Sequence, residues 1–147
     1  FRIYLPALEG AVPETVRSVP PAALHGTETI LLVEDDAAIR EYTSAALDGY
    51  GYHVISAANA GEALLIFERE GDRIDLILTD VVMPYTSGRE LADRLEKLRP
   101  GIRVLFMSGY TDDMIVHHGV VHEGVNFIQK PFVPADLARK VRSVLDA

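Results

Sequence analysis

Short apolar runs alternate with amphipathic stretches along this chain from residue 29 onward. A short apolar run bounded by turn residues is typical of a buried strand, and apolar residues spaced three or four apart are typical of a helix packed on a core. The runs predict five strands, over residues 30–33, 53–57, 74–79, 102–107 and 125–128. The stretches that follow them predict helices that begin near Asp36, Asn59, Ser87, Asp112 and Pro134.

The apolar positions within three of these helices predict which faces pack on the core. They are Ile39, Tyr42, Ala46 and Leu47 in the first helix, Leu91, Leu95 and Leu98 in the third, and Leu137, Val141 and Leu145 in the last. Pro134 suits the first position of the last helix, because a backbone N–H there would have no partner within the helix.

Strands that alternate with helices predict an α/β fold, a doubly wound five-stranded parallel sheet with helices on both faces. Right-handed crossovers bring the carboxyl end of every strand to the same edge of such a sheet. The polar residues that follow the apolar runs are Glu34, Asp35, Asp80, Ser108 and Lys130. We therefore expect these side chains to share one pocket, although Glu34 and Lys130 are far apart in the sequence.

Composition sets limits on the class of protein. The 147 residues favour one domain, at 29–147, preceded by a proline-containing linker at 1–28. There is no cysteine, which excludes disulfides and zinc-thiolate sites. The net charge of −8 argues against direct binding of nucleic acid. No apolar stretch approaches the length of a membrane span, and the start of the chain does not resemble a signal peptide, so we expect a cytoplasmic protein with no membrane contact in this segment.

The grouped side chains suggest a phosphoryl-accepting aspartate. Asp80 would lie at the sheet edge between the carboxylates that follow the first strand and the ammonium of Lys130. Phosphoryl transfer needs positioning and charge neutralisation more than covalent chemistry from the protein. A metal ion beside the adjacent carboxylates would relieve their repulsion and supply that neutralisation.

Four short motifs resemble the receiver domain of two-component response regulators. They are residues 31–36 followed by Arg40, residues 80–84 followed by Gly88, residues 107–110, and residues 130–132. They occur in the family's order, each after a predicted strand, and the resemblance covers residues 28–147. It implies a flavodoxin-like fold and Mg²⁺-dependent transfer of a phosphoryl group from a partner's phosphohistidine onto an aspartate.

The resemblance also assigns roles around the metal. Asp80 matches the phospho-acceptor, and Glu34 with Asp35 matches the acidic pair that holds Mg²⁺. Asp35, Asp80 and the backbone carbonyl of Val82 would be direct ligands. Glu34 replaces the more usual aspartate, and its longer side chain is expected to reach the metal through water. The next carboxylate, Asp36, is better interpreted as a helix cap.

Three further residues match the family's phosphoryl contacts and switch. Lys130 would pair with Asp80 and later with a phosphoryl oxygen, and its bond to Pro131 is expected to be cis. Ser108 matches the hydroxyl that binds the phosphoryl group and moves with it. Phe127 matches the aromatic switch position, but a core aromatic in a strand explains it equally well.

The resemblance implies a partner and a context. The domain would catalyse its own phosphorylation and dephosphorylation, with phosphate supplied by a phosphorylated histidine kinase or phosphotransfer domain. Residues 1–6 resemble the last strand of a kinase ATP-binding domain, which predicts the carboxyl-terminal receiver of a hybrid sensor histidine kinase. We expect no effector domain after Ala147, and so no direct transcriptional output from this segment.

Other interpretations of the same residues are weaker. A degenerate receiver that only binds partners is the alternative, and the presence of Asp80, Lys130 and the acidic pair argues against it. An Asp-nucleophile phosphatase of another α/β family would need a second carboxylate where Val82 stands. His118 and His122 have metal-ligand spacing, but they lack a third ligand and are interpreted as surface residues.

Overall fold

A computed structural model describes residues 21–109 and 125–147 of the chain. The strands are β1 (Thr29–Val33), β2 (His53–Ala57), β3 (Leu76–Asp80), β4 (Arg103–Ser108) and β5 (Asn126–Gln129). The helices are α1 (Ala37–Asp48), α2 (Ala60–Glu70), α3 (Gly88–Leu98) and α5 (Pro134–Leu145), with short 3₁₀ turns η1 (Pro21–Leu24) and η2 (Gly71–Arg73).

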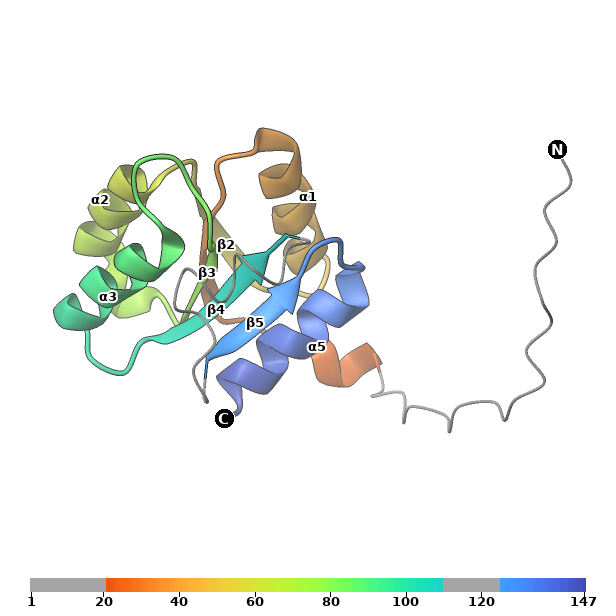
Figure 1. Cartoon of the computed structure of the whole chain (residues 1–147). Coiled ribbons are helices and arrows are strands. Elements are labelled where there is room, and N and C mark those ends of the chain that lie inside the picture. Colours follow the sequence, from red (N-terminus) through yellow and green to blue (C-terminus); the bar gives the residue numbers. More distant parts are fainter. Residues whose placement is uncertain (1–20, 110–124) are drawn as a thin grey trace, which may run out of the picture.

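The strands form one parallel sheet in the order β2-β1-β3-β4-β5. The sheet stands between two pairs of helices, with α1 and α5 on one side and α2 and α3 on the other (Figure 1). The predicted doubly wound α/β fold is therefore confirmed. Its order reverses between β1 and β3, and ligands of such sheets bind outside the carboxyl ends of the strands at this point.

Alternating side chains of the central strands supply two apolar cores. Ile30, Leu32, Leu76 and Leu78 pack with α1 and α5, whereas Leu31 and Ile77 pack with α2 and α3. A parallel strand covered on both faces needs apolar residues at every position, which explains the unbroken runs.

Polar caps fix where the helices begin. The Asp36 carboxylate accepts a hydrogen bond from the Ile39 N–H, and Asn59 caps α2 in the same way, as predicted. Ser87 begins α3 in a capping box with Glu90, in which each side chain binds the backbone N–H of the other residue. The cap at Ser87 also fixes the end of the loop that follows Asp80.

Two details differ from the predicted elements. The third strand begins at Leu76, not at 74, because Ile74 follows the η2 turn and its carbonyl accepts a hydrogen bond from Arg99. Leu98 and Tyr42 are exposed, so their assignment to core faces was wrong. Leu98 is the last residue of α3, and the Tyr42 hydroxyl donates instead to the Phe132 carbonyl at 3.1 Å.

The residues just before β1 pack on the domain. Leu24 is buried, and its carbonyl accepts a hydrogen bond from the Tyr52 hydroxyl at 3.0 Å. Glu28 and Arg142 of α5 form an ion pair with an N···O distance of 2.7 Å. This segment is thereby joined to both the α1–β2 turn and α5.

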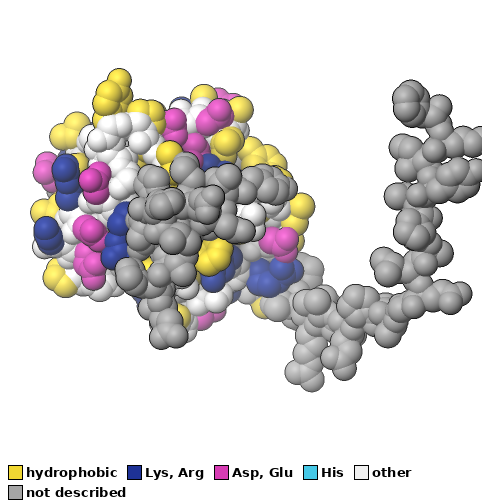
Figure 2. Space-filling model, viewed as in Figure 1, with side chains coloured by type: hydrophobic (Ala, Val, Ile, Leu, Met, Phe, Trp, Pro, Cys, Tyr) yellow, Lys and Arg dark blue, Asp and Glu magenta, His cyan; other side chains and the backbone are white. Residues whose placement is uncertain are grey.

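Several predictions concern residues outside the described ranges. These are the strand at 1–6, the helix at 112–118, Tyr110, His118 and His122. Within the described ranges, no helix is both long and apolar enough to cross a membrane. On the face shown in Figure 2, acidic and basic side chains are interspersed on the α2–α3 side. One ion pair there joins Arg89 to Asp93 along α3.

Candidate functional site

The carboxyl edge of the sheet brings the predicted site residues together. Asp80 ends β3, and the next residue, Val81, donates its N–H to the Met107 carbonyl of β4 at 2.9 Å. The Lys130 N–H donates to the Ser108 carbonyl at 2.7 Å, which extends the β4–β5 ladder by one step. Parallel register therefore places the Asp80, Ser108 and Lys130 backbones along one edge.

Lys130 joins two carboxylates from different strands. Its Nζ lies 2.6 Å from Asp80 Oδ2 and 2.7 Å from Glu34 Oε2. Glu34 is 1% exposed and the Asp80 side chain 13% exposed, so these charge-assisted hydrogen bonds lie in a partly desolvated site. The predicted pairing of Lys130 with Asp80 is confirmed, and the contact with Glu34 was not anticipated.

Burial and pairing act on the pKa values of this group. Burial raises the pKa of the Glu34 carboxyl above its ordinary value, and the hydrogen bond from Lys130 opposes part of that change. For Lys130, burial alone would lower the pKa, but hydrogen bonds to Asp80 and Glu34 outweigh it and raise the pKa. The ammonium is therefore fully charged at neutral pH.

Three carboxylates form a cluster suited to a metal ion. Glu34, Asp35 and Asp80 each offer one oxygen, and these oxygens lie within 4.8 Å of one another. Hard oxygen donors of this kind suit Mg²⁺, which also keeps several waters. Asp36 is used as the helix cap, as predicted.

The remaining contacts of Glu34 show how its longer side chain is accommodated. Its Oε1 accepts the Asp36 N–H at 3.1 Å, while its Oε2 accepts from Lys130. Arg40 Nη1 donates to the Glu34 carbonyl at 2.7 Å. The turn after β1 is therefore fixed from both sides, with the Asp35 side chain exposed to solvent.

A glycine lets the following loop close over the backbone of Asp80. The Gly88 N–H donates to the Val81 carbonyl at 2.9 Å. A Cβ at Gly88 would lie 1.9 Å from the Asp80 carbonyl oxygen, so no side chain fits there. The second carboxylate oxygen of Asp80, Oδ1, accepts the Val82 N–H at 3.2 Å.

Ser108 and Phe127, the predicted switch residues, are not in contact with Asp80 through any hydrogen bond of the described structure. Ser108 is buried at the end of β4, and its hydroxyl donates to the Gly109 carbonyl at 3.3 Å. Phe127 is 44% exposed. The core-aromatic interpretation of Phe127 was therefore wrong, because β5 is an edge strand and its side chains are only partly covered.

The Lys130–Pro131 peptide bond is cis, as predicted. The sequence shows Arg40 and Gly88 only as members of motifs, and their contacts in the structure give each a structural role. The Ser87–Glu90 capping box was missed, although Ser followed three residues later by Glu is its recognisable sequence signal.

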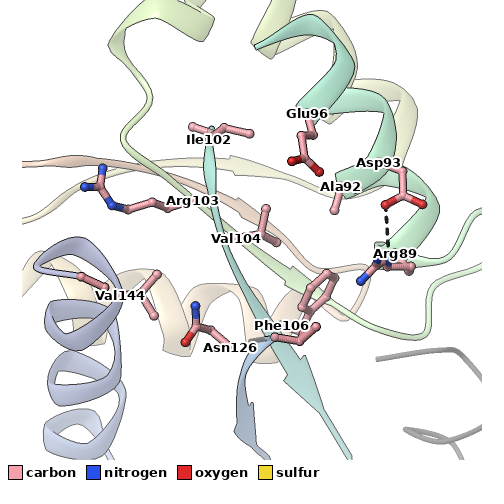
Figure 3. A pocket seen from close by; sticks show the side chains of 12 residues that line it. Arg89, Ala92, Asp93, Glu96, Ile102, Arg103, Val104, Phe106, Asn126 and Val144 are labelled. Carbon is pink, nitrogen blue, oxygen red and sulfur yellow. Dashed lines mark ion pairs between the residues drawn. The ribbon is translucent and has the colours of Figure 1, made fainter. Parts of the chain in front are cut away.

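A separate pocket of about 300 Å³ lies between α3, β4, β5 and α5 (Figure 3). Its lining includes Arg89, Glu96, Val104, Phe106 and Asn126. None of the predicted site residues borders it. The Asp80 group at the carboxyl edge of the sheet is therefore separate from this pocket.

A family model of the response regulator receiver domain matches residues 30–142. This chain belongs to the response regulator receiver family. The Asp80–Lys130 pair and the acidic cluster lie within the matched region of this receiver.

Two curated relatives come from Brucella abortus. The receiver is 36% identical to the sensor kinase CckA over 154 residues, which covers 99% of this chain and 16% of CckA. It is 33% identical to the response regulator receiver protein CpdR, covering 80% of this chain and 97% of CpdR. The chain thus spans a small part of one relative and nearly all of the other.

Solved structures agree with the fold. The receiver domain from the hybrid histidine kinase CckA superposes with a TM-score of 0.66 at 32% identity, covering 80% of this chain and 98% of that domain. The chemotaxis protein CheY4 of Vibrio cholerae superposes with a TM-score of 0.72 at 27% identity, covering 81% and 99%. The fold is therefore the CheY-like, flavodoxin-like fold implied by the motifs.

Proposed function

We propose that this receiver accepts a phosphoryl group from a phosphohistidine onto Asp80, in two-component phosphorelay signalling. The observation that carries the proposal is the position of Lys130 Nζ, 2.6 Å from Asp80 and next to a cluster of three carboxylates. A purely structural ion pair would not need two further carboxylates at the same edge, whose charges repel one another.

In the proposed reaction, an Asp80 carboxylate oxygen attacks phosphorus, and the P–N bond of the donor breaks. The bonding electrons return to the imidazole, so the product is an aspartyl phosphate. Lys130 already neutralises Asp80 and would move its ammonium to a phosphoryl oxygen as negative charge shifts outward. The Val82 N–H holds the other carboxylate oxygen and orients the group.

Mg²⁺ is the proposed cofactor, held by Asp35, Asp80 and the Val82 carbonyl, with Glu34 contributing through water. When bound, Mg²⁺ neutralises charge on the transferring phosphoryl group. Asp35 is exposed and so is available for coordination. Glu34, in contrast, has both oxygens engaged by Lys130 and the Asp36 N–H, which supports its indirect role.

We assign the switch to Ser108 and Phe127. Among the described residues, the Ser108 hydroxyl donates to the carbonyl of its neighbour Gly109 at 3.3 Å, a long contact that it would exchange for one to a phosphoryl group on Asp80. Phe127 would then move from its exposed position into space near β4, where Phe106 is its partner in register. Both movements are biased by the charge placed on Asp80.

The proposed donor is a histidine kinase or a phosphotransfer domain, and the proposed location is the cytoplasm. Similarity to the sensor kinase CckA over 99% of this chain supports a parent that is a hybrid sensor histidine kinase. In that parent, residues 1–6 would end a kinase ATP-binding domain, residues 1–28 would form the linker, and residues 29–147 the receiver. The receiver would regulate the kinase or drain phosphate from it.

The reaction can be tested with a small phosphodonor. The wild-type chain, incubated with Mg²⁺ and acetyl phosphate, should gain the mass of one phosphoryl group, and Asp80→Asn should not. Asp48→Asn is a matched control, because Asp48 is an exposed carboxylate at the end of α1. A wild type that binds Mg²⁺ but gains no mass would favour the degenerate receiver.

A further inference from the structure

Tyr85 combines two unusual features in the loop that joins β3 to α3 (Figure 1). Its φ angle is +69°, and among the described residues no other non-glycine residue has a positive φ. Its side chain is also fully exposed, at 106% of the reference area. A bulky residue in the left-handed region is a genuine outlier, which glycine or asparagine would avoid.

Packing does not compensate for the strained backbone at Tyr85. A fully exposed ring buries no area against its own fold, so the chain gains no stability from this aromatic side chain. Strained residues persist where the surrounding structure holds them, and they gather at functional sites. The choice of tyrosine here therefore points to a contact outside the chain.

The surrounding loop holds Tyr85 in place. Val81 and Met83 are buried, and the Thr86 N–H donates to the Pro84 carbonyl at 2.9 Å. The loop is closed at its end by the bond from the Gly88 N–H to the Val81 carbonyl. The ring is thus presented on a backbone anchored at both sides, and a fixed aromatic ring is the kind of residue that dominates protein interfaces.

The position of this loop identifies the kind of partner. The loop begins directly after Asp80, whose side chain is only 13% exposed, so a protein donor must cover the loops around it to bring phosphorus within reach. Residues 81–86 carry no charge, and Val82 is exposed as well as Tyr85. On this side of Asp80 the surface therefore suits apolar side chains, in contrast to the acidic turn at Glu34 and Asp35.

We propose that Tyr85 is a docking contact for the protein that carries the donor phosphohistidine. This inference rests on the proposed phosphoryl transfer to Asp80. Tyr85 positions a protein donor and takes no part in the chemistry. The rate of phosphoryl transfer from a small phosphodonor should therefore not depend on it. Removal of the Tyr85 ring should slow transfer from a protein donor and leave transfer from a small phosphodonor unchanged.

The experiment compares phosphorylation from two donors. The protein donor is the Brucella abortus sensor kinase CckA, autophosphorylated with ATP and carrying Asn at its own position equivalent to Asp80. The small donor is acetyl phosphate. For Tyr85→Asn, kcat/KM from the kinase should fall by about 10- to 30-fold, with the acetyl phosphate rate unchanged within about twofold. Tyr85→Phe should retain the wild-type rate with both donors.

Stability gives an independent readout. Asparagine tolerates the left-handed region, so the thermal midpoint of Tyr85→Asn should equal or exceed that of the wild type. Leu98→Asn is the matched control, since Leu98 is exposed at the far end of α3, and it should leave both rates unchanged.

Four results would overturn the docking role. They are an unchanged rate from the kinase in Tyr85→Asn, an equal loss with acetyl phosphate, a lowered thermal midpoint, and a wild type that accepts phosphate from acetyl phosphate but not from the kinase. A wild type that neither donor labels would instead contradict the phosphoryl-accepting function itself.

Discussion

Lys130 Nζ lies 2.6 Å from Asp80 Oδ2, although the two residues are 50 positions apart in the chain. The same ammonium lies 2.7 Å from Glu34, which is almost completely buried. A buried carboxylate without water or a partner is costly, so Glu34 depends on Lys130 for its charge. Lys130 therefore stabilises the fold at the sheet edge as well as serving the proposed chemistry.

We expect Lys130→Gln to lower the free energy of unfolding by ~2 kcal/mol in the absence of Mg²⁺. Removing one partner from a fully buried ion pair costs about 3–5 kcal/mol, and the partial exposure of this site reduces the loss. Urea unfolding measures the difference. The double variant Lys130→Gln with Glu34→Gln should recover part of the stability, because the unpaired buried charge is gone.

Lys97→Gln serves as the control for removing a lysine charge, since Lys97 is exposed on α3. It should change the unfolding free energy by less than about 0.5 kcal/mol. If Lys130→Gln is as stable as this control, the ion pair has no stabilising role and Glu34 does not depend on Lys130.

Asp35→Asn should stabilise the metal-free fold but weaken the binding of Mg²⁺. Without Mg²⁺, the variant should be more stable than the wild type by roughly 0.5 kcal/mol, because one of three clustered carboxylates loses its charge. With Mg²⁺ at ~100 times its Kd, the wild type should gain about 2.7 kcal/mol. Asp35→Asn should need about tenfold more Mg²⁺ for the same gain. Thermal unfolding across a Mg²⁺ titration measures both effects.

Asp72→Asn, in the η2 turn on the surface, is the matched control for that titration. It should follow the wild-type Mg²⁺ dependence. If Asp35→Asn and the wild type reach half of their stabilisation at the same Mg²⁺ concentration, Asp35 is excluded from the metal site.

The sequence was sufficient to predict the sheet and the meeting of Asp80 with Lys130. Apolar runs separated by helical periodicity require parallel strands, and parallel strands bring their carboxyl ends to one edge. The start of β3 was predicted too early because Ile74 is apolar and buried, as a strand residue would be. Its carbonyl accepts a hydrogen bond from Arg99 instead of joining the sheet, and the local pattern does not contain that distant contact.

Exposure depends on contacts that a local pattern does not contain. Phe127 is apolar and lies in a strand, but it is exposed because β5 occupies the edge of the sheet. The second partner of Lys130 was missed for a similar reason. The sequence places Glu34 at the correct edge, but only the turn fixed by Arg40 shows where its longer side chain ends.

Gly88→Ala should destabilise the domain and disturb the site together. The new Cβ would lie 1.9 Å from the Asp80 carbonyl oxygen, and backbone atoms on both sides would have to move. Overpacking of this kind typically costs about 1–3 kcal/mol. We expect such a loss in urea unfolding and a slower gain of phosphoryl mass from acetyl phosphate.

Gly49→Ala is the control, because it makes the same change at a glycine where there is space for a Cβ atom. Gly49 caps α1 with a φ of −62°, and a Cβ there would meet backbone oxygens at 3.4 Å. Its stability should stay within about 0.5 kcal/mol of the wild type. Equal behaviour of the two alanine variants would contradict the close approach of the loop to Asp80.

The ion pair between Glu28 and Arg142 should stabilise the domain in a pH-dependent manner. The hydrogen bond from Arg142 is the main cause that holds the pKa of Glu28 below its ordinary value of 4.5. A carboxyl whose pKa is lower in the folded state contributes its stability above the unfolded pKa and loses it as the pH falls through the folded pKa. Glu28→Gln should therefore cost ~0.5–1 kcal/mol at neutral pH.

The cost of Glu28→Gln should fall once the pH drops below the unfolded value of 4.5 and vanish below the lower folded pKa, because the wild-type carboxyl is then protonated too. Urea unfolding of both proteins at neutral pH and near pH ~3 measures this convergence. Arg139→Gln removes an exposed pair with Asp136 on the same helix and should change stability little at either pH. The free energies of unfolding of Glu28→Gln and the wild type could instead differ by the same amount at both pH values. Glu28 would then act through packing, and its charge would not stabilise the contact between the segment before β1 and α5.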